Sequence, residues 1–317
     1  MTPKRVLVTR RLPVGSLDPL HEAGFDVVQR GEPMVLTPDE MMTEVRQADG
    51  VVCLLTDRID RRVLEAGLGR LRVVANVAVG YDNIDVEAAK DLGVVVCNTP
   101  GVLDDTTADL TFLLILAASR LASDAERDLR AGRWTGWAVD QYLGQDVHGR
   151  TLGVIGWGRI GRRVADRARG FGMRVLHHAR RPSGEPGYIA DLDELIREAD
   201  VVSIHVPLSD DTYHLIGPAR IGLMKPTAVL VNTARGPIVD EEALADALHS
   251  NRIFAAGLDV YESEPAVHPR LLSAPRTVLL PHVGSASVAT RTAMGRLASR
   301  SVVDVLSGRL PSTLVTI

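Results

Sequence analysis

The chain alternates between short apolar runs and amphipathic or polar segments along its whole length. Short apolar runs separated by helical patterns are typical of strands in a parallel sheet, with helices as the connections. The pattern therefore predicts parallel βαβ units. It falls into two series, with strands expected at 5–9, 25–29, 50–55, 71–76 and 93–98 in the first and at 151–156, 173–178, 200–206, 228–233, 253–260 and 277–282 in the second.

Two longer helical segments accompany these series. One helical segment is expected over about residues 103–130, between the two series. The other, at 287–306, places apolar residues near a 3.6-residue period and has Gly308 as its expected C-terminal cap. The predicted fold class is α/β, with two Rossmann-like domains, each a doubly wound parallel sheet.

Composition and charge narrow the function classes. The 317 residues are 45% hydrophobic, which suits a soluble protein of two domains. A formal net charge of −4, without a long basic run, argues against nucleic-acid binding. The N-terminus enters a strand without a secretory signal, and the longest apolar run, 110–118, is far below the roughly 18 residues of a membrane span. We expect a cytoplasmic protein that does not bind membranes.

The two cysteines lie in or beside valine-rich segments. Cys53 follows Val51 and Val52, and Cys97 ends the run GVVVC. Cysteines in such surroundings are usually buried. We expect buried free thiols, with no disulfide and no metal site.

Residues 151–168 read TLGVIGWGRIGRRVADRA, which is an apolar strand, three glycines and a helix. Gly156, Gly158 and Gly161 have the spacing G-x-G-x-x-G. In a dinucleotide-binding fold these glycines allow a tight turn, close approach of a pyrophosphate and close packing of helix on strand, and the helix N-terminus faces the phosphates. Ordinary strand-to-helix turns also contain glycines. Because the next strand follows as well, the motif predicts a dinucleotide site.

The end of the next strand indicates which dinucleotide. An acidic residue about 20 positions beyond the first glycine usually binds the adenosine ribose hydroxyls, but this chain has Ala179, followed by Arg180 and Arg181. A carboxylate there would repel a 2′-phosphate, whereas arginine supplies charge and forked donors. The pair therefore predicts a preference for NADP(H) over NAD(H). The alternative is a solvated basic loop.

Three polar residues follow strands of the second series. Arg235 and Glu264 follow the apolar runs at 228–233 and 253–260, and His282 is the last residue of the run at 277–282. The carboxyl ends of parallel strands form the ligand crevice of an open sheet, so these side chains are expected to converge. Taken singly, each also has a structural explanation. Together, an anion binder, an imidazole and a carboxylate are what reduction of a 2-keto acid requires.

Six segments resemble the D-isomer-specific 2-hydroxyacid dehydrogenase family over essentially the whole chain. They are NVAVGYDNID at 76–85, GVVVCNTPGVLDDTTADL at 93–110, LGVIGWGRIG at 152–161, VNTARGPIVDEEAL at 231–244, AGLDVYESEP at 256–265 and LLPHVGSAS at 279–287. Within that family the chain looks most like the glyoxylate/hydroxypyruvate reductases, because of CLLTDRID at 53–60, ANVAVGYDNID at 75–85 and the arginine pair.

The resemblance implies a role for each catalytic candidate. Arg235 would bind the carboxylate and carbonyl oxygen of the substrate, His282 would donate the proton, and Glu264 would hydrogen-bond His282. Glu262 is a competing carboxylate. Glu264 is preferred because it directly precedes Pro265, as the family's catalytic glutamate precedes a proline.

The resemblance also implies the binding residues. A loop would give backbone N–H groups to the substrate carboxylate, and it consists of Val77, Ala78, Val79 and Gly80; a tight glycine turn is its structural alternative. The positions that would line the cofactor are Thr107, Gly156, Gly158, Arg159, Ile160, Gly161, Ala179, Arg180, Arg181, Val206, Pro207, Thr212, Thr233, Ala234, Asp259, His282 and Gly284.

The family fold implies a discontinuous substrate domain. Residues 1–99 and 286–317 would form this catalytic domain, and residues 100–285 would be an inserted NAD(P)-binding domain. The helix from about residue 103 and the loop with Trp134 and Trp137 match the segment through which family members form homodimers. Alternatively, the two tryptophans are core anchors.

The leading hypothesis is NADPH-dependent reduction of a small 2-keto acid, such as glyoxylate or hydroxypyruvate, to the 2-hydroxy acid. A second hypothesis keeps the fold and changes the substrate to 2-ketogluconate, pyruvate, 3-phosphohydroxypyruvate or phosphite. Among these, 3-phosphohydroxypyruvate ranks lower, because many family members devoted to phosphoglycerate carry an extra regulatory module that this sequence lacks. A third hypothesis is a non-catalytic, cofactor-sensing binding protein, because some family members are corepressors.

Overall fold

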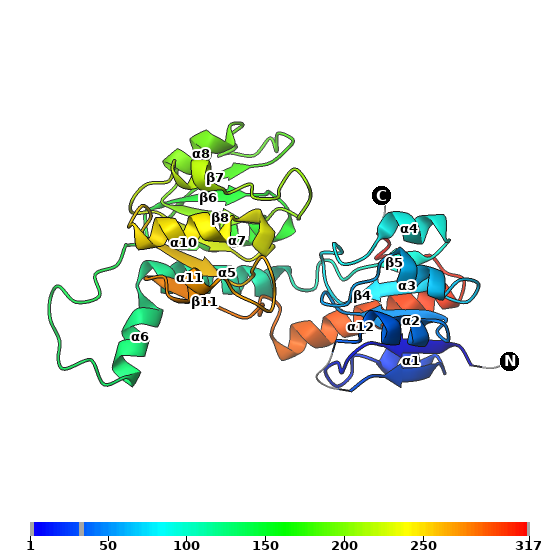
Figure 1. Ribbon diagram of the computed structural model, residues 1–317. Coiled ribbons are helices and arrows are strands. Elements are labelled where there is room, and N and C mark those ends of the chain that lie inside the picture. The colour runs from blue at the N-terminus through cyan, green and yellow to red at the C-terminus, as the bar shows by residue number, and fades with distance from the viewer. Residues whose placement is uncertain (1–2, 32–34, 316–317) are drawn as a thin grey trace. The chain divides into compact units, whose positions relative to one another are not determined.

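The structure is a computed structural model that describes residues 3–31 and 35–315. The chain forms two compact units (Figure 1), unit 1 with Met1–Leu103 and Ser285–Ile317, and unit 2 with Asp104–Gly284. In each unit a parallel sheet lies between helices. The predicted α/β fold class is confirmed, and every expected strand is present.

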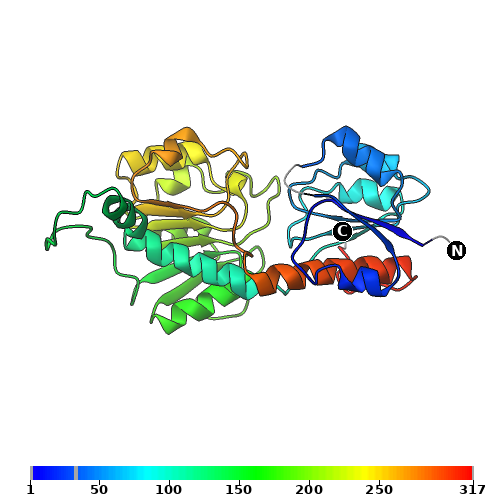
Figure 2. The same ribbon diagram turned by 90° about the horizontal axis from the view of Figure 1, so that it is seen from below.

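Unit 1 is built on a five-stranded sheet in the order β2-β1-β3-β4-β5. Helices α1 and α12 cover one face, and α2, α3 and α4 lie on the other (Figure 2). The strands are β1 (Arg5–Val8), β2 (Asp26–Gln29), β3 (Gly50–Cys53), β4 (Val73–Asn76) and β5 (Val95–Cys97). The helices are α1 (Asp18–Glu22), α2 (Pro38–Val45), α3 (Arg61–Ala66), α4 (Val86–Asp91) and α12 (Val288–Leu306).

The predicted terminal helix α12 belongs to this sheet. The hydroxyl of Ser287 accepts the N–H of Thr290 at 3.1 Å and so caps its first turn. Gly308 ends it with a positive φ of 75°, as expected of a C-terminal glycine. A side chain at Gly50 would come within 2.9 Å of Val302, so that glycine lets α12 pack directly on β3.

Unit 2 is built on a six-stranded sheet in the order β11-β10-β9-β8-β6-β7. Helices α5 and α7 cover one face, and α8, α9, α10 and α11 the other. The strands are β6 (Thr151–Ile155), β7 (Arg174–His178), β8 (Val201–Ile204), β9 (Val229–Asn232), β10 (Ala255–Leu258) and β11 (Thr277–Leu279). The helical elements are α5 (Asp104–Ser119), α6 (Ala122–Arg130), α7 (Arg159–Gly170), α8 (Leu192–Glu198), α9 (Pro218–Ile221), the 3-10 helix η1 (Gly236–Ile238), α10 (Glu241–His249) and α11 (Pro269–Leu272).

The helical segment expected over residues 103–130 is two helices rather than one. Leu121 takes a left-handed backbone conformation, with φ 55°, and the chain bends by 69° between α5 and α6. Helix α5 is apolar on most sides and packs under the sheet, whereas α6 has no buried residue and projects from unit 2 (Figure 1). The bend therefore separates a core helix from an exposed one.

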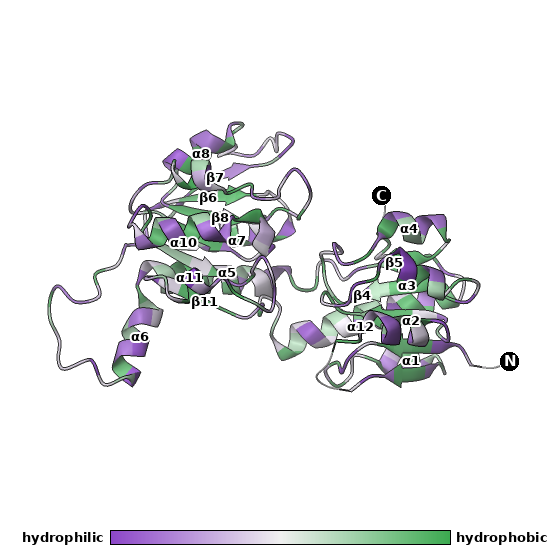
Figure 3. Cartoon of the chain, viewed as in Figure 1, coloured by the Kyte–Doolittle hydropathy of each residue, from purple (hydrophilic) through white to green (hydrophobic). Residues whose placement is uncertain are grey.

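The apolar residues are concentrated in the strands and in the helix faces that cover them (Figure 3). Cys53 and Cys97 are both buried and free, as predicted. Among the described residues, no single helix is long and apolar enough to span a membrane; α5 and α6 satisfy the criteria of length and composition only as a bent pair.

Candidate active site

Most of the predicted cofactor residues of unit 2 follow the strands at the carboxyl edge of its sheet, whereas Thr107 lies on α5. Strand β7, the next in sequence, lies on one side of β6, and β8, which follows β7, lies on the other, so the winding direction reverses at β6. Open α/β sheets bind ligands at the carboxyl ends of the strands beside such a reversal. The glycine motif at 156–161 begins directly after β6.

Two glycines of the motif are required by close packing, and the third lies in open space. Gly156 has φ 101°, and a side chain there would lie 2.5 Å from the carbonyl oxygen of His205. A side chain at Gly161 would lie 2.2 Å from the carbonyl oxygen of Gly156. A side chain at Gly158 would meet nothing within 4 Å, so the backbone before α7 is accessible to a ligand. This cradle fits the pyrophosphate of a dinucleotide at the N-terminus of α7.

The arginine pair lies on an exposed loop after β7. Ala179 is half-buried, and Arg180 and Arg181 are exposed. Neither arginine forms an ion pair with a described residue. A hollow of about 510 Å³ lies along α7, and its lining includes Trp157 and Arg159 of the glycine motif and Glu185 of the loop after β7.

Two further groups of predicted cofactor residues are joined by hydrogen bonds. After β8, which leads into Val206, the hydroxyl of Thr212 donates to the carbonyl oxygen of Pro207 at 2.7 Å and so closes the loop. After β9, which leads into Thr233 and Ala234, the hydroxyl of Thr233 lies 2.9 Å from that of Thr111 on α5. The Thr111 hydroxyl in turn donates to the carbonyl oxygen of Thr107 at 2.8 Å.

His282 and Glu264 form the central polar contact. Nδ1 of His282 lies 2.8 Å from Oε2 of Glu264, and each side chain is about a quarter exposed, at 26% and 27%. The other carboxylate oxygen of Glu264 accepts the N–H of Tyr261 at 3.0 Å. Burial alone would raise the pKa of Glu264, but the hydrogen bond and charge of His282, with the Tyr261 N–H and the Arg235 charge, leave that pKa lowered. The carboxylate is therefore ionised.

Asp259 fixes the backbone that carries His282. Its carboxylate accepts the N–H groups of Val283 and Gly284, both at 2.8 Å, and its carbonyl oxygen accepts the N–H of His282 at 2.8 Å. His282 has φ 54°, a left-handed conformation that a residue other than glycine rarely takes. Burial raises the pKa of Asp259, although these donors and the His282 charge oppose that shift.

Tyr261 also supports this segment, a role the sequence did not indicate. Its buried hydroxyl donates to the carbonyl oxygen of Leu280 at 2.9 Å, two residues before His282. Burial, with nearby carboxylates, raises the pKa of Tyr261 well above its usual range, so the hydroxyl keeps its proton. The ends of β10 and β11 are therefore bonded together on both sides of His282.

Glu262, the competing carboxylate, is used elsewhere. Its Oε1 accepts the N–H of Glu241 at the start of α10 at 2.8 Å and lies 3.2 Å from Nε2 of His214. In return, the carboxylate of Glu241 accepts the N–H of Glu262 at 2.7 Å. Glu264, not Glu262, contacts His282.

Arg235 begins the turn after β9. The side chain of Asn232 holds this turn by donating to the carbonyl oxygen of Arg235 at 2.8 Å and accepting the N–H of Ala234 at 3.0 Å. The Arg235 guanidinium donates to the carbonyl oxygen of Ala234 at 2.8 Å. It is close enough for its charge to lower the pKa of Glu264.

The predicted carboxylate-binding loop lies in unit 1, after β4. The carbonyl oxygens of Ala78, Val79 and Gly80 accept hydrogen bonds from Thr99 N–H, Asn98 Nδ2 and Asn76 Nδ2, at 2.8–2.9 Å. Their N–H groups have no acceptor among the described residues. The N–H of Val77, by contrast, donates to the carbonyl oxygen of Cys53 at 2.8 Å. This correction leaves the N–H groups of 78–80 as candidate donors, because strand pairing extends one residue beyond β4.

Comparison with known proteins decides the family. Residues 112–284, more than half of the chain, match the D-isomer specific 2-hydroxyacid dehydrogenase, NAD binding domain. The chain belongs to the D-isomer specific 2-hydroxyacid dehydrogenase family. It is therefore an NAD(P)-dependent oxidoreductase that acts on CH–OH groups. The resemblance inferred from the sequence is confirmed.

Individual members of the family match nearly the whole chain. A glyoxylate reductase of Thermococcus onnurineus (strain NA1) is 44% identical over 99% of this chain and 96% of its own. The crystal structure of TT0316 protein from Thermus thermophilus has a TM-score of 0.94 and 44% identity, covering 98% of this chain and 100% of that one. An NADPH-dependent glyoxylate/hydroxypyruvate reductase from Sinorhizobium meliloti, in complex with NADP and malonate, has a TM-score of 0.87 and 35% identity, covering 99% and 97%.

Proposed function

We propose that this dehydrogenase reduces a small 2-keto acid of the glyoxylate or hydroxypyruvate type, with NADPH as the preferred cofactor. The observation that carries the proposal is the His282–Glu264 pair at 2.8 Å, with Arg235 close enough to act on the same carboxylate electrostatically. Unit 2 would bind the cofactor and unit 1 would serve as the substrate domain. Relatives named glyoxylate reductase support the substrate class.

The protein's part in catalysis is to hold the substrate and to move one proton. The nicotinamide cofactor, when bound, supplies a hydride to the carbonyl carbon, which leaves negative charge on the carbonyl oxygen. A protonated His282 would donate its Nε2 proton to that oxygen, because Glu264 occupies Nδ1. The ionised Glu264 favours the imidazolium, and the Asp259 and Tyr261 contacts keep its backbone in place.

Substrate recognition requires donors to a carboxylate. The guanidinium of Arg235 is a planar, forked donor that suits a 2-keto acid, in which carboxylate and carbonyl oxygens are adjacent. The loop at 78–80 offers three peptide N–H groups without acceptors among the described residues. Its three carbonyl oxygens accept hydrogen bonds from neighbouring residues, which fixes the loop. We propose Arg235 of unit 2, and in unit 1 the N–H groups of 78–80, as carboxylate-binding groups.

The cofactor preference rests on the loop after β7. The glycine cradle at 156–161 would hold the pyrophosphate, and Arg180 and Arg181 would pair with the 2′-phosphate of NADPH. The other cofactor-lining residues remain as the sequence predicts them, namely Thr107, Arg159, Ile160, Ala179, Val206, Pro207, Thr212, Thr233, Ala234, Asp259 and Gly284. Two exposed arginines beside an uncharged Ala179 support the phosphate over a free ribose hydroxyl.

Replacing both arginines by alanine tests this preference. Arg180→Ala with Arg181→Ala should raise the KM for NADPH about ten- to a hundredfold, because a charge-assisted hydrogen bond contributes about 1.5–3 kcal/mol. The KM for NADH should change much less, because NADH has no 2′-phosphate. Initial rates with each cofactor at saturating glyoxylate measure both values. Equal changes for the two cofactors would show the pair to be a solvated loop.

A substrate panel tests the reaction itself. NADPH oxidation would be followed with glyoxylate, hydroxypyruvate, pyruvate, 2-ketogluconate and 3-phosphohydroxypyruvate, and then repeated with NADH. We expect the highest kcat/KM for glyoxylate or hydroxypyruvate with NADPH. Inactivity on all five, with NADPH binding retained, would instead favour a cofactor-sensing binding protein.

We also propose a homodimer formed through α6 and the loop that follows it. Trp134 and Trp137 on this loop are 49% and 81% exposed, so they are not core anchors of the single chain. Exposed large apolar side chains on one projecting segment favour burial against a second copy.

A further inference from the structure

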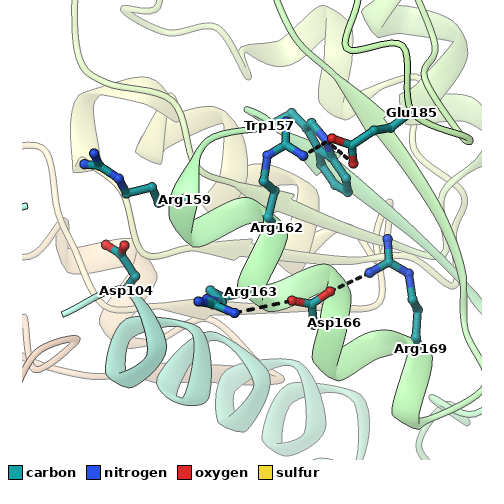
Figure 4. Close-up of a pocket in the computed structure, with 8 residues that line it drawn as sticks. All are labelled: Asp104, Trp157, Arg159, Arg162, Arg163, Asp166, Arg169 and Glu185. Carbon is teal, nitrogen blue, oxygen red and sulfur yellow. Dashed lines mark hydrogen bonds and ion pairs between the residues drawn. The ribbon is translucent and has the colours of Figure 1, made fainter. Parts of the chain in front are cut away.

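The loop that carries the arginine pair is fastened to the glycine motif through Glu185 (Figure 4). The indole N–H of Trp157, between Gly156 and Gly158, donates to Oε2 of Glu185 at 3.0 Å. The guanidinium of Arg162 on α7 forms an ion pair with Oε1 of the same carboxylate. Both carboxylate oxygens are therefore occupied by donors from the phosphate-binding side of the fold.

The Trp157 ring is held by two neighbouring side chains. The buried imidazole of His177 on β7 stacks against it, with ring centroids 3.8 Å apart and an interplanar angle of 18°. The Arg162 guanidinium lies over the ring at 5.3 Å from its centroid. The anchor for Glu185 is thus a fixed group rather than a flexible surface side chain.

Other hydrogen bonds join the rest of the loop to β7. The hydroxyl of Ser183 lies 2.6 Å from Nε2 of His177 and accepts the N–H of Glu185 at 3.1 Å. The chain then returns to β7, where His177 N–H donates to the Gly187 carbonyl oxygen at 2.8 Å. The arginine pair therefore lies on a loop that is anchored at both ends.

A carboxylate on this loop raises an electrostatic question. If Glu185 were unpaired, it would repel a 2′-phosphate and could instead accept the ribose hydroxyls of NADH, as the acidic residue missing at Ala179 usually does. Arg162 neutralises its charge, and Trp157 takes its other oxygen. The loop thus gains a firm anchor without presenting a negative charge to the cofactor.

We propose that Glu185, neutralised by Arg162, is a positioning residue for cofactor selectivity: it fixes the loop of Arg180 and Arg181 beside the glycine motif and keeps its own charge away from the 2′-phosphate. This inference rests on the NADPH preference proposed above. It adds a selectivity determinant outside the residues that would touch the phosphate.

The test is a pair of variants that separate charge from contact. Arg162→Gln leaves Glu185 charged and unpaired, and should raise the KM for NADPH about three- to tenfold, because each exposed charge pair contributes up to about 1 kcal/mol and the phosphate carries nearly two charges. The KM for NADH should stay the same or fall, with kcat little changed. Adding Glu185→Gln removes the unpaired charge while keeping an acceptor for Trp157, so the double variant should recover most of the NADPH affinity.

Arg163→Gln is the matched control. Arg163 is the next residue on α7 and pairs with Asp105 and Asp166, at 3.6 and 3.9 Å, rather than with Glu185. It removes the same charge, so any effect it shares with Arg162→Gln is general electrostatics. The excess penalty of Arg162→Gln should also shrink as KCl is raised, since exposed charges are screened.

Two outcomes would overturn the proposal: equal changes in KM for NADPH and NADH with Arg162→Gln, or no recovery in the double variant. If Arg180→Ala with Arg181→Ala discriminates between the cofactors while these variants do not, only the role of Glu185 fails. If the Arg180→Ala, Arg181→Ala double variant does not discriminate between the cofactors, the NADPH preference itself fails. In that case, the rate of trypsin cleavage after Arg180, followed by mass spectrometry, still tests whether Glu185 anchors the loop. Anchoring predicts faster cleavage in Arg162→Gln than in Arg163→Gln.

Discussion

Replacing Glu264 by glutamine should move the pH dependence of both reaction directions toward acid. The substitution keeps the size of the side chain and a hydrogen bond to Nδ1 of His282, now 2.8 Å from Oε2, but removes the negative charge. Reduction needs a protonated His282, and the charge of Glu264 favours that form. Without this charge the alkaline limb of reduction should fall to lower pH. Oxidation of the hydroxy acid, which needs neutral His282 as base, should extend to lower pH.

The size of the shift follows from the partial exposure of the pair. Opposite charges about 4 Å apart attract by about 1 kcal/mol in water and about 4 kcal/mol at an effective dielectric constant of 20. Both side chains are about a quarter exposed, so an intermediate value applies. Since about 1.4 kcal/mol corresponds to a factor of ten, the shift should lower the rate of reduction at alkaline pH by about tenfold or more. Because the pKa of Glu264 is lowered, the wild-type carboxylate is charged throughout the neutral pH range. Wild type and Glu264→Gln therefore differ by one charge across that range.

The assay is initial rate against pH in both directions, with Glu262→Gln as the control. Glu262 bonds to the start of α10 and to His214, so its replacement should leave both limbs where they are. Unchanged limbs in Glu264→Gln, a reductive limb that moves toward alkali, or an equal shift in Glu262→Gln would refute the coupling between Glu264 and His282.

Three further substitutions test other parts of the structure. Arg235→Lys should lower kcat/KM for glyoxylate at least about a hundredfold, since lysine lacks the forked donor. The Kd for NADPH, measured by fluorescence titration, should stay near the wild-type value. Near-normal turnover would show that Arg235 is not in the active site. Gly236→Ala should lower the free energy of unfolding, measured in urea, by about 3 kcal/mol or more, because the added carbon would lie 1.8 Å from the backbone of Tyr261. Gly158→Ala is the control, because a side chain at Gly158 would lie in open space. Equal free energies of unfolding for the two variants would contradict this packing argument. Trp137→Asp should convert the proposed dimer to monomer in light scattering, and an unchanged mass would place the interface elsewhere.

The sequence predicted the elements better than it predicted contacts. Strands were identifiable because each is a short apolar run between helical patterns. The break at Leu121 was not, since no glycine or proline marks it and the bend arises from the different surroundings of α5 and α6. The proline that directly follows Glu264 favours Glu264 over Glu262 as the partner of His282. Only the fold, however, shows that Glu262 bonds to Glu241 on α10.

The supporting residues were the least predictable part of the candidate site. Nothing in the local sequence indicates that the Tyr261 hydroxyl reaches Leu280 or that Glu185 reaches Trp157, because these partners are 19 and 28 positions apart. For the same reason, the sequence does not indicate the bond from the Val77 N–H to Cys53, which removes that N–H from the candidate donors. Such contacts depend on how neighbouring strands and loops are aligned in space.

The division of unit 1 into two stretches of sequence has a consequence for how the protein is made. Helix α12 packs on β3, β4 and α1, and Ser299 bonds to the carbonyl oxygen of Ser16 at 2.9 Å. During translation the first five strands therefore emerge long before the helix that covers one face of their sheet. Unit 2 is contiguous, so it has all its strands while unit 1 still lacks α12. Although nascent domains generally fold from the N-terminus onward, we expect the later-synthesised unit of this chain to finish folding on the ribosome before the unit that was begun first.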